Sequence, residues 1–589
     1  EISLGLVGSE MCIRDSYMTD EKRIERLSAM LKRRGIVLPA FEIYGGVSGL
    51  IDYGPVGASI RRRVIQNWIE HWTINGDIVE IDSPTITPEN VLVASGHVGE
   101  FNDLMTQCEN CSSAFRADQL IEEFHPNPDI LDSDEIDKIL NTEKINCPNC
   151  DKPKWTSSKP MNLMFGTKIG AMKSSRQAYM RPETAQGMFM LYPSLYRHFR
   201  QKLPFGAIQT GKGYRNEISP RQGMIRLREF NMAELEYFID PENPPIVDLS
   251  MKNDKISLIP DPNGNEHKEI KMSFQEAINN NVIKDSTVGY FLSRTWDFLI
   301  GVGIIPSKIR FRQHEGNEMA HYAEDCWDCE ILGEHGWIEC VGIANRTCHD
   351  LLSHEKHSNS SSLRAWREFE EVRVENKEIL SPKTSVLGPM FRAKAGIVLS
   401  ALENLSQLPE NLPFNLELSD GTSVEITDQM VEKKMIRNSV AGEWFTPHVI
   451  EPAFGIDRII WHILDHAYEE TEKEGENYNL LKLKESVAPA DVIVLPLFEK
   501  DGMGIAAREL NSQINRIKGV KCLIDSSKSI GRRYARADEI GVPWAITVDH
   551  QTLEDSTVTI RRRDDQKQIR ANIDELLILI NSNAVSTLF

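Results

Sequence analysis

The sequence predicts an α+β fold for most of the chain and a separate α/β domain over residues 488–589. Three observations lead to this prediction. The 589 residues are too many for one hydrophobic core, so two or more domains are expected. Residues 213–238 have the pattern of a β-hairpin. From residue 488 onward, strand-like and helix-like segments alternate, as they do in compact α/β domains.

The composition is typical of a soluble globular protein, with 41% hydrophobic residues and a mean hydropathy of -0.35. No apolar run reaches the roughly 20 residues that a membrane span needs. The net charge of -20 argues against a general nucleic-acid binder but leaves room for a local basic patch. Ten cysteines, several of them in Cys-x-x-Cys pairs, indicate a reducing compartment and a metal site rather than a disulfide framework.

Residues 1–17, EISLGLVGSEMCIRDSY, differ from the rest and are predicted to be a non-native leader. They have no basic segment, and their apolar stretch is too short for a signal peptide. MTDEKRIERLSAML, starting at Met18, has the pattern of a natural start that runs into a helix. The alternative is a native N-terminal strand. We expect the main domain to span residues 18–487.

Residues 55–72 predict the clearest helix, with Pro55 in its first turn. Its apolar side chains fall on one stripe at helical spacing: Val56, Ile60, Val64, Ile65, Trp68, Ile69 and Trp72. The next segment, DIVEIDSPTITPENV, is strand-like, and its Pro84 and Pro88 place it at an edge or an interface.

Three segments of the main domain are predicted to be insertions: the polar, turn-rich 104–160, then 240–288, and the charged, irregular 355–440. Mixed strands are expected at 290–350 and 443–465. In the C-terminal domain the predicted strands are ADVIVLPL, VKCLID, PWAITVD and TVTIRRR, and the predicted helices are GIAARELNSQINRIK, SIGRRYARADEIG and QIRANIDELLILI.

Two Cys-x-x-Cys pairs lie in the first insertion, at Cys108, Cys111, Cys147 and Cys150. Such pairs can supply the four thiolates of a closed tetrahedral site, which suits structural zinc. The alternative is unliganded thiols, since the pairs are further apart than is usual in a zinc ribbon. A second set is a weaker metal candidate, because buried free cysteine is common: Cys326, Cys329, Cys340 and Cys348.

The hairpin at 213–238, GYRNEISPRQGMIRLREFNMAELEYF, gathers charges on one surface. A strand from Gly213 to Ile218 would place Arg215 and Glu217 on the same face, and SPRQG supplies a turn. On the return strand one face would hold Arg226, Arg228, Phe230, Met232 and Glu234. Because burying an unpaired charge costs several kcal/mol, this surface is predicted to hold a flat anionic ligand that carries an amine.

This hairpin, with Arg215-x-Glu217 and then Arg226-x-x-x-Phe230, resembles motif 2 of class II aminoacyl-tRNA synthetases. VIEPAFGIDRII, with Arg458, resembles motif 3, and the helix at 55–72 with the strand around Pro84 resembles motif 1, the dimer contact. The wording of several segments is similar to that of homodimeric glycyl-tRNA synthetases: SGHV (95–98), FRADQLIE (115–122), RPETAQG (181–187), EMAHYAEDCWD (318–328), GIANRTCHDL (342–351) and SIGRRYARADEIGVPWAITVD (529–549). The resemblance runs from about Met18 to the C-terminus. It implies an antiparallel sheet flanked by helices, a C-terminal anticodon-binding domain and a homodimer.

The resemblance also implies an ATP site. Arg215 would bind the α-phosphate, since guanidinium matches phosphate geometry. Glu217 would accept from the adenine amino group, and Phe230 and Arg458 would stack on either side of the ring. Arg226 would hold the bent triphosphate, and Glu339 would bind Mg²⁺. The other positions carried over to this site are Asn216, Ile225, Cys340 and Gly455.

For glycine, the resemblance implies that Glu183 and Glu234 bind the ammonium, with Arg346 and Arg116 either on the carboxylate side or fixing the acidic wall. Phe230, Glu451 and Ala453 complete this site, which would exclude every side chain with a Cβ for lack of room. The family usually has serine where this chain has Ala453. Losing that hydroxyl is expected to cost about 0.5–1.5 kcal/mol and to raise the KM for glycine.

Basic residues concentrate in the C-terminal domain, at Lys528, Arg532, Arg533, Arg536, Arg561, Arg562 and Arg563. We expect Arg532, Arg533 and Arg536 to contact tRNA phosphates; the alternative is an ordinary charged helix face. Trp544 is assigned to the core. The expected activity is ATP-dependent attachment of glycine to tRNA in the cytoplasm. Two alternatives stay open: a catalytically silent nucleic-acid-binding subunit, and a synthetase for serine, threonine or proline.

Overall fold

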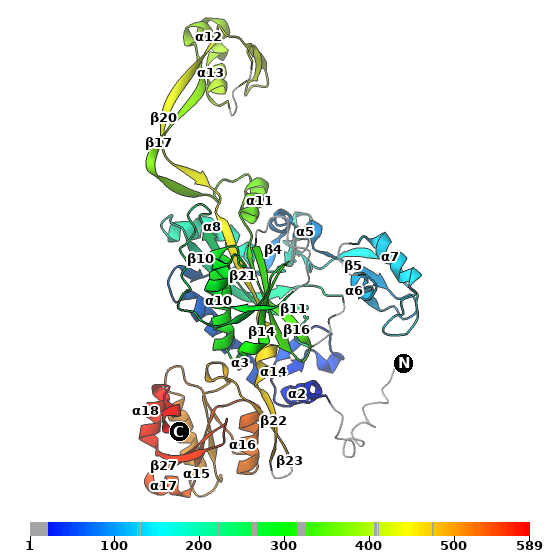
Figure 1. Cartoon of the computed structure of the whole chain (residues 1–589), viewed down its shortest axis with the longest axis vertical. Coiled ribbons are helices and arrows are strands. Elements are labelled where there is room, and N and C mark those ends of the chain that lie inside the picture. The colour runs from blue at the N-terminus through cyan, green and yellow to red at the C-terminus, as the bar shows by residue number, and fades with distance from the viewer. Residues whose placement is uncertain are drawn as a thin grey trace. The chain divides into compact units, whose positions relative to one another are not determined.

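A computed structural model describes residues 22–125, 128, 131–218, 220, 223–261, 268–314, 325–405, 409, 411–473 and 476–589 (Figure 1). The chain divides into two compact units, one formed by the residues up to Leu363 together with Pro447–Phe589, the other by Arg364–Thr446. The leader predicted at 1–17 lies outside the described residues, as do most of the SPRQG turn and the start of EMAHYAEDCWD.

A nine-stranded, mostly antiparallel sheet forms the centre of the larger unit (Figure 1). Its order is β13 (Ile270–Met272), β12 (Ile256–Ile259), β14 (Ile309–Gln313), β15 (Asp325–Gly333), β16 (Gly336–Asn345), β21 (His448–Gly455), β11 (Glu229–Ile239), β10 (Phe205–Tyr214) and β3 (Ile78–Glu80). Only the β3–β10 and β12–β14 pairs are parallel. This sheet, with the helices on it, confirms the predicted fold class.

The two faces of β11 have different neighbours. Leu235, Tyr237 and Ile239 point into a core with α3 (Pro55–Thr73), α10 (Ser286–Gly301) and α14 (Ile456–Ala467). The predicted stripe of α3 is confirmed, because Trp68 and Trp72 pack against β21 and α10 through Phe454 and Phe291. The opposite face of β11 carries Phe230, Met232 and Glu234 and ends against α8 (Ala185–His198). Segments 286–301 and 456–467 are helices, so the strands predicted there were wrong.

The connection between the two strands of the predicted hairpin is longer than expected. β10 ends at Tyr214 and β11 begins at Glu229, so Arg215, Arg226 and Arg228 lie in the irregular connection and not on strands. The segment predicted as an insertion at 240–288 extends the main sheet with β12 and β13, followed by α9 (Phe274–Asn279). Its apolar residues join the main core, which explains why it does not form a unit of its own.

Shorter elements surround the sheet. The N-terminal helix α2 (Arg23–Arg33) precedes the β1 (Val37–Pro39) and β2 (Ile51–Tyr53) pair. β4 (Ile86–Pro88), β9 (Arg176–Met180) and β8 (Gly166–Ile169) form a second sheet near α4 (Glu89–Ala94) and α5 (His97–Glu100). The cysteine-rich segment folds into β6 (Ala114–Arg116), β5 (Asn102–Gln107) and β7 (Lys159–Asn162), with α6 (Ala117–Leu120) and α7 (Ser133–Thr142). α11 (His349–Ser358) and the β22 (Tyr468–Lys473)–β23 (Glu476–Leu481) ribbon complete this unit's main domain.

The smaller unit is regular, which corrects the irregular structure expected within 355–440. Its long ribbon of β17 (Ala365–Pro382) and β20 (Val431–Phe445) leads to α12 (Thr384–Phe391), α13 (Ala395–Glu403), β18 (Phe414–Glu417) and β19 (Ser423–Ile426) (Figure 1). Many side chains on both faces of the ribbon are exposed, so the usual alternation of apolar and polar residues is absent. One helical stretch, Thr384–Glu403, is a candidate membrane span by length and composition alone, and its Leu387, Val398 and Leu402 pack into this unit's own small core.

The C-terminal segment is a five-stranded α/β domain, as predicted. Its order is β25 (Cys522–Ile524), β24 (Val492–Pro496), β26 (Trp544–Val548), β27 (Thr557–Arg562) and β28 (Gln568–Asn572), and the first three strands are parallel. The helices are α15 (Met503–Ile514), α16 (Ile530–Glu539), α17 (His550–Asp555) and α18 (Ile573–Asn581). Only the first half of QIRANIDELLILI was predicted wrongly, because it forms β28. Trp544 is buried in the core, as expected.

Candidate active site

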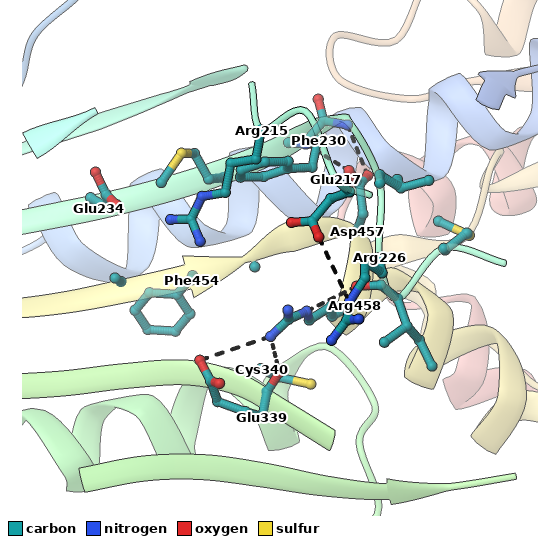
Figure 2. Close-up of a pocket in the computed structure, with 17 residues that line it drawn as sticks. Arg215, Glu217, Arg226, Phe230, Glu234, Glu339, Cys340, Phe454, Asp457 and Arg458 are labelled. Carbon is teal, nitrogen blue, oxygen red and sulfur yellow. Dashed lines mark hydrogen bonds and ion pairs between the residues drawn. The ribbon is translucent and has the colours of Figure 1, made fainter. Parts of the chain in front are cut away.

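A cavity of about 210 Å³ opens on the face of the sheet that carries Phe230 (Figure 2). The hairpin, β16, β21 and the start of α14 contribute its walls. Most of the residues predicted for the nucleotide line it: Arg215, Glu217, Ile225, Arg226, Phe230, Glu339, Cys340, Gly455 and Arg458. Of the residues predicted for glycine, Phe230, Glu234 and Ala453 line it. Asn216 does not line this cavity.

Arg215 is held between two aromatic rings. Its guanidinium carbon lies 5.2 Å from the centre of the Phe101 ring and 5.5 Å from that of Phe230. Cation–π contacts of this kind stabilise a guanidinium without neutralising its charge. In Figure 2 the Arg215 side chain extends past Phe230 toward the middle of the cavity. A cation fixed in this way is suited to an anionic group of a ligand.

Arg458 is anchored on one side by carbonyl groups. Its Nη1 donates to the backbone oxygen of Glu339 (2.7 Å), and its Nε donates to that of Ile225 (3.1 Å). The Glu339 carboxylate lies 3.8 Å from Nη1 and is half-exposed. Carbonyls satisfy hydrogen bonds without removing charge, so the half-exposed Glu339 carboxylate is the one anionic partner of Arg458 among the described residues that line the cavity.

Arg226 and Glu217 face each other across the cavity entrance at 3.9 Å, as Figure 2 shows. Burial raises the pKa of Glu217 above its usual value, although Arg226 and Arg215 act against this. Arg228 was predicted on the same face but does not line the cavity. It donates to the backbone oxygens of Glu217 (3.1 Å) and Ser48 (2.6 Å), because it lies before the strand begins.

Glu234 lines the cavity, and three further carboxyl groups interact with it electrostatically; we call the four the acid wall: Glu183, Glu234, Glu236 and Glu451. Glu234 accepts hydrogen bonds from the Thr184 N–H (2.7 Å) and hydroxyl (2.6 Å). Burial, together with the charges of Glu183 and Glu451, raises the pKa of Glu234 to about 8. Neither carboxylate oxygen of Glu236 has a hydrogen-bond partner in the described part of the chain. Within the described residues, the Glu236 carboxyl group is therefore uncompensated.

Two cations compensate the wall only in part. His97 lies 3.2 Å from Glu183, and Gln186 donates to the same carboxylate. Burial alone would raise the pKa of Glu183, but the ion pair with His97 lowers it below the usual value. Arg346 donates to Glu451 (2.5 Å) and also to Asp350 (2.8 Å). An ammonium group placed at Glu234 would complete the charge balance.

The structure does not support the predicted contact of Arg116 with the glycine carboxylate. Arg116 does not line the cavity, and its guanidinium pairs with Asp118 and, at 3.3 Å, with Asp103. Its charge is thus used inside the cysteine-rich segment. Glu183, Arg346 and Glu451 do not line the cavity either. The charges of Glu183 and Glu451 act on Glu234, and that of Arg346 acts on Glu183 and Glu451.

The four cysteines of the first set come together. Cys108 and Cys150 have their sulfurs 3.5 Å apart, Cys111 and Cys147 have theirs 3.6 Å apart, and all four sulfurs lie within 4.8 Å of one another. Four thiols at these separations have the donor set of a tetrahedral zinc site. The second set forms no such cluster among the described residues. There Cys329 and Cys340 are buried, and Cys340 lies 3.6 Å from a ring nitrogen of His462.

Most of the basic residues predicted to bind tRNA have structural partners instead. Arg533 is buried and donates to the backbone oxygens of Pro496, Ser527 and Lys528, so it cannot contact a phosphate; this part of the prediction was wrong. Arg536 pairs with Asp525. Of the three predicted arginines, only Arg532 is exposed. The buried Arg561 pairs with Asp538 at 2.8 Å.

Sequence reasoning missed an exposed apolar cluster at the carboxyl ends of β24 and β26. The rings of Phe498 and His550 lie 6.4 Å apart, and Phe498, Ile505 and Leu553 are about half-exposed. The strand order reverses here: β25 and β26 lie on either side of β24, the position where α/β sheets commonly bind ligands. It also missed Phe101 and Asp457. Asp457, which accepts from the Asn231 N–H (2.6 Å), was recognisable only as the neighbour of Arg458 in motif 3.

Comparison with known proteins supports both domains. Residues 169–256 match the family "tRNA synthetase class II core domain (G, H, P, S and T)", and residues 491–583 match "Anticodon binding domain". The chain is 45% identical over 577 residues to "Glycine--tRNA ligase" of Methanocaldococcus jannaschii, covering 94% of this chain and 97% of that protein. It is 43% identical over 559 residues to the protein of the same name from Archaeoglobus fulgidus, covering 94% and 95%.

Proposed function

From the premise that this chain belongs to the glycine--tRNA ligase family of class II aminoacyl-tRNA synthetases, we propose which of its residues perform each part of the reaction. The reaction is the attachment of glycine to tRNA at the expense of ATP. The observation that supports the assignment best is the cavity itself. It places fixed guanidinium groups beside a buried acid wall, and the chain is similar to the ligases along almost its whole length.

In the first step, an oxygen of the glycine carboxylate attacks the α-phosphorus of ATP, and the bond to pyrophosphate breaks. Arg215 neutralises the charge that builds up on the α-phosphate, and Arg458 binds the far end of the triphosphate. Phe230 stacks on adenine, whose amino group donates to Glu217. In the second step, a ribose hydroxyl of the terminal tRNA adenosine attacks the activated carbonyl, and AMP leaves. Neither step needs a protein nucleophile, so positioning and charge neutralisation supply the rate.

Magnesium accompanies ATP in this class, and Glu339 fits it. Its carboxylate is half-exposed at the cavity wall beside Arg458, and a hard cation prefers such oxygen ligands. When bound, the ion neutralises charge on the phosphates. The chain's own part is to offer the Glu339 carboxylate and to keep Arg458 at a fixed distance from it.

Glycine is bound through its ammonium group. Glu234 accepts from the ammonium, and Glu183, kept ionised by His97, supplies the second negative charge. Ala453 lies directly across from Glu234 on the neighbouring strand and lines the same cavity. Arg346 holds Glu451 in place and does not itself reach the cavity.

The cysteine cluster is proposed to hold structural zinc through Cys108, Cys111, Cys147 and Cys150. Its support is the mutual approach of four sulfurs in a segment with only a small apolar core. The tRNA anticodon loop is proposed to stack on Phe498 and His550, since exposed rings bind unpaired bases. Arg532 and Lys528 lie in the segment that follows the neighbouring strand β25 and are the candidate phosphate contacts.

A homodimer is part of the proposal. A second hollow lies between β4 and α8, and Ile86, Met190 and Leu191 expose apolar surface there. A second copy of the chain would cover it. Analytical ultracentrifugation of wild type and Ile86→Asp tests this; a monomeric wild type at micromolar concentration would refute it. A cytoplasmic location, where tRNA is used in translation, completes the proposal.

ATP–pyrophosphate exchange with single amino acids tests the function. Exchange that depends on glycine, followed by glycine transfer to tRNA, is the expected result. No exchange with any amino acid would instead leave the silent binding subunit. Exchange with serine, threonine or proline but not with glycine would leave the other substrate class.

A further inference from the structure

Strand β5 connects the cysteine cluster directly to the nucleotide cavity. Phe101, just before the strand, carries the guanidinium of Arg215 on its ring at 5.2 Å. Cys108, just after the strand, is one of the four thiols. An extended strand is a stiff connection, because each of its residues is fixed by hydrogen bonds to its neighbours. A change at one end of β5 is therefore transmitted to the other.

The chain leaves the cysteine-rich segment beside the place where it enters. β7 pairs with β5 from Asn102–Asn162 to Met105–Lys159. Leu163, just after β7, donates its N–H to the Phe101 carbonyl (3.2 Å) and accepts from the Asn216 N–H (2.7 Å). The entering strand thus contacts Arg215, and the leaving strand contacts its neighbour Asn216.

We call residues 102–162 the cysteine module. Its end distant from the cavity is stabilised by few interactions apart from the cysteines. Among its described residues, the apolar core has few buried side chains: Ala117, Ile121, Ile136 and Leu140 around α6 and α7, and Phe115 beside the thiols. The backbones of Cys108 and Trp155 also pair in an isolated antiparallel β-bridge outside the strands. Modules of this size usually need a metal or disulfides to stay folded. The order of β5 is expected to depend on the metal.

We propose that the metal-bound cysteine module is a positioning element for Arg215, acting through Phe101 and Leu163. The proposal rests on the proposed function, which gives Arg215 its role at the α-phosphate of ATP, and on the proposed zinc site. Phe101 is a positioning residue because it acts through Arg215. The Phe101 ring also lies 5.5 Å from that of His97, which pairs with Glu183, so loss of the module should weaken glycine binding as well as ATP binding.

Calorimetric titration of the full-length protein with α,β-methylene-ATP measures this coupling, together with its zinc content by mass spectrometry. Phe101→Leu removes one cation–π contact and is expected to weaken analogue binding about twofold to thirtyfold, with zinc retained. Cys147→Ser with Cys150→Ser is expected to lose zinc and to weaken analogue binding at least as much. Hydrogen exchange should then rise in β5 and β7.

Two matched controls accompany these variants. Phe124→Leu changes an exposed ring of the same module, and Cys522→Ser changes a buried thiol of the C-terminal domain. Both should bind zinc and the ATP analogue as wild type does.

The proposal is overturned if the zinc-free double variant, or Phe101→Leu, binds the analogue with wild-type affinity. A wild type that contains no zinc would overturn the metal's part in it. These results differ from failure of the proposed function, which would appear as a wild type without glycine-dependent exchange.

Discussion

The cavity and the C-terminal domain are both rich in arginine, but they use it in opposite ways. In the cavity, Arg215 and Arg458 are held by aromatic rings and carbonyl groups, which leave the positive charge available. In the C-terminal domain, Arg561 is neutralised by the buried Asp538, and Arg533 is enclosed by carbonyls away from solvent. What an arginine does therefore depends on what surrounds it, and a count of arginines does not reveal this.

The largest expected effect concerns the arginines that stabilise the C-terminal domain. Arg561→Met leaves the Asp538 carboxylate buried without its cation, with the Tyr478 hydroxyl still donating to it, which should lower the free energy of unfolding by about 3–5 kcal/mol. Urea unfolding followed by fluorescence measures it. Combining Arg561→Met with Asp538→Leu removes both charges and should recover most of the loss. A stable single variant with weakened tRNA binding would show that Arg561 contacts RNA after all.

The next largest effect concerns the arginines of the cavity. Arg215→Ala should lower the rate of ATP–pyrophosphate exchange by about 10²–10³, as loss of one charge-stabilising donor does in other active sites. The unfolding midpoint should stay close to that of wild type. Arg197→Ala, on the surface of α8, is the matched control and should exchange normally. Exchange within threefold of wild type would remove Arg215 from the catalytic machinery.

The same contrast explains how much could be predicted from the sequence. The stripe of α3 and the alternation of the C-terminal domain were visible because apolar periodicity reports burial directly. Arg215, Phe230 and Arg458 were found because their spacing matches family motifs. Arg533 was misassigned because the Pro496 carbonyl that accepts from it comes from another part of the chain. Phe101 was missed because its partner Arg215 is far away in sequence.

The exposed cluster with Phe498 and His550 is proposed to bind the anticodon loop, in place of the predicted patch of basic residues. Phe498→Ala should lower kcat/KM for tRNA by an amount equivalent to about 1–3 kcal/mol, the value of one base–aromatic stack. Exchange without tRNA should not change, because the ring lies in the C-terminal domain. Ile578→Ala, on the exposed side of α18, provides the control. Unchanged aminoacylation kinetics would place the anticodon elsewhere.

The acidic residues of the two regions also differ in whether a cation pairs with them. The pH dependence of glycine binding measures this difference. Asp538 already has its cation, whereas Glu234 has none of its own. With its pKa raised to about 8 by burial and by Glu183 and Glu451, Glu234 is protonated in the free enzyme at lower pH. Binding of the ammonium needs the ionised form, so each pH unit below 8 should weaken glycine binding about tenfold, or about 1.4 kcal/mol.

Calorimetry in buffers of different ionisation enthalpy should detect the proton that glycine releases from Glu234 at pH 7. Glu234→Gln should bind glycine weakly and without this pH dependence. Equal glycine affinity at pH 6 and pH 8 in wild type would mean that Glu234 is already ionised, and that the acid wall is better compensated than its contacts indicate.

The smallest expected effect concerns the residue opposite Glu234 and the KM for glycine. Ala453 lies across from Glu234 in the register of β11 and β21, at the position where the family usually has serine. Ala453→Ser would add a hydroxyl beside the site proposed for the ammonium, and one added hydrogen bond is equivalent to about 0.5–1.5 kcal/mol. The KM for glycine should fall about twofold to twelvefold while the KM for ATP stays constant. A higher KM for glycine would show that the hydroxyl instead takes space that the substrate needs, because Ala453 lines the same cavity.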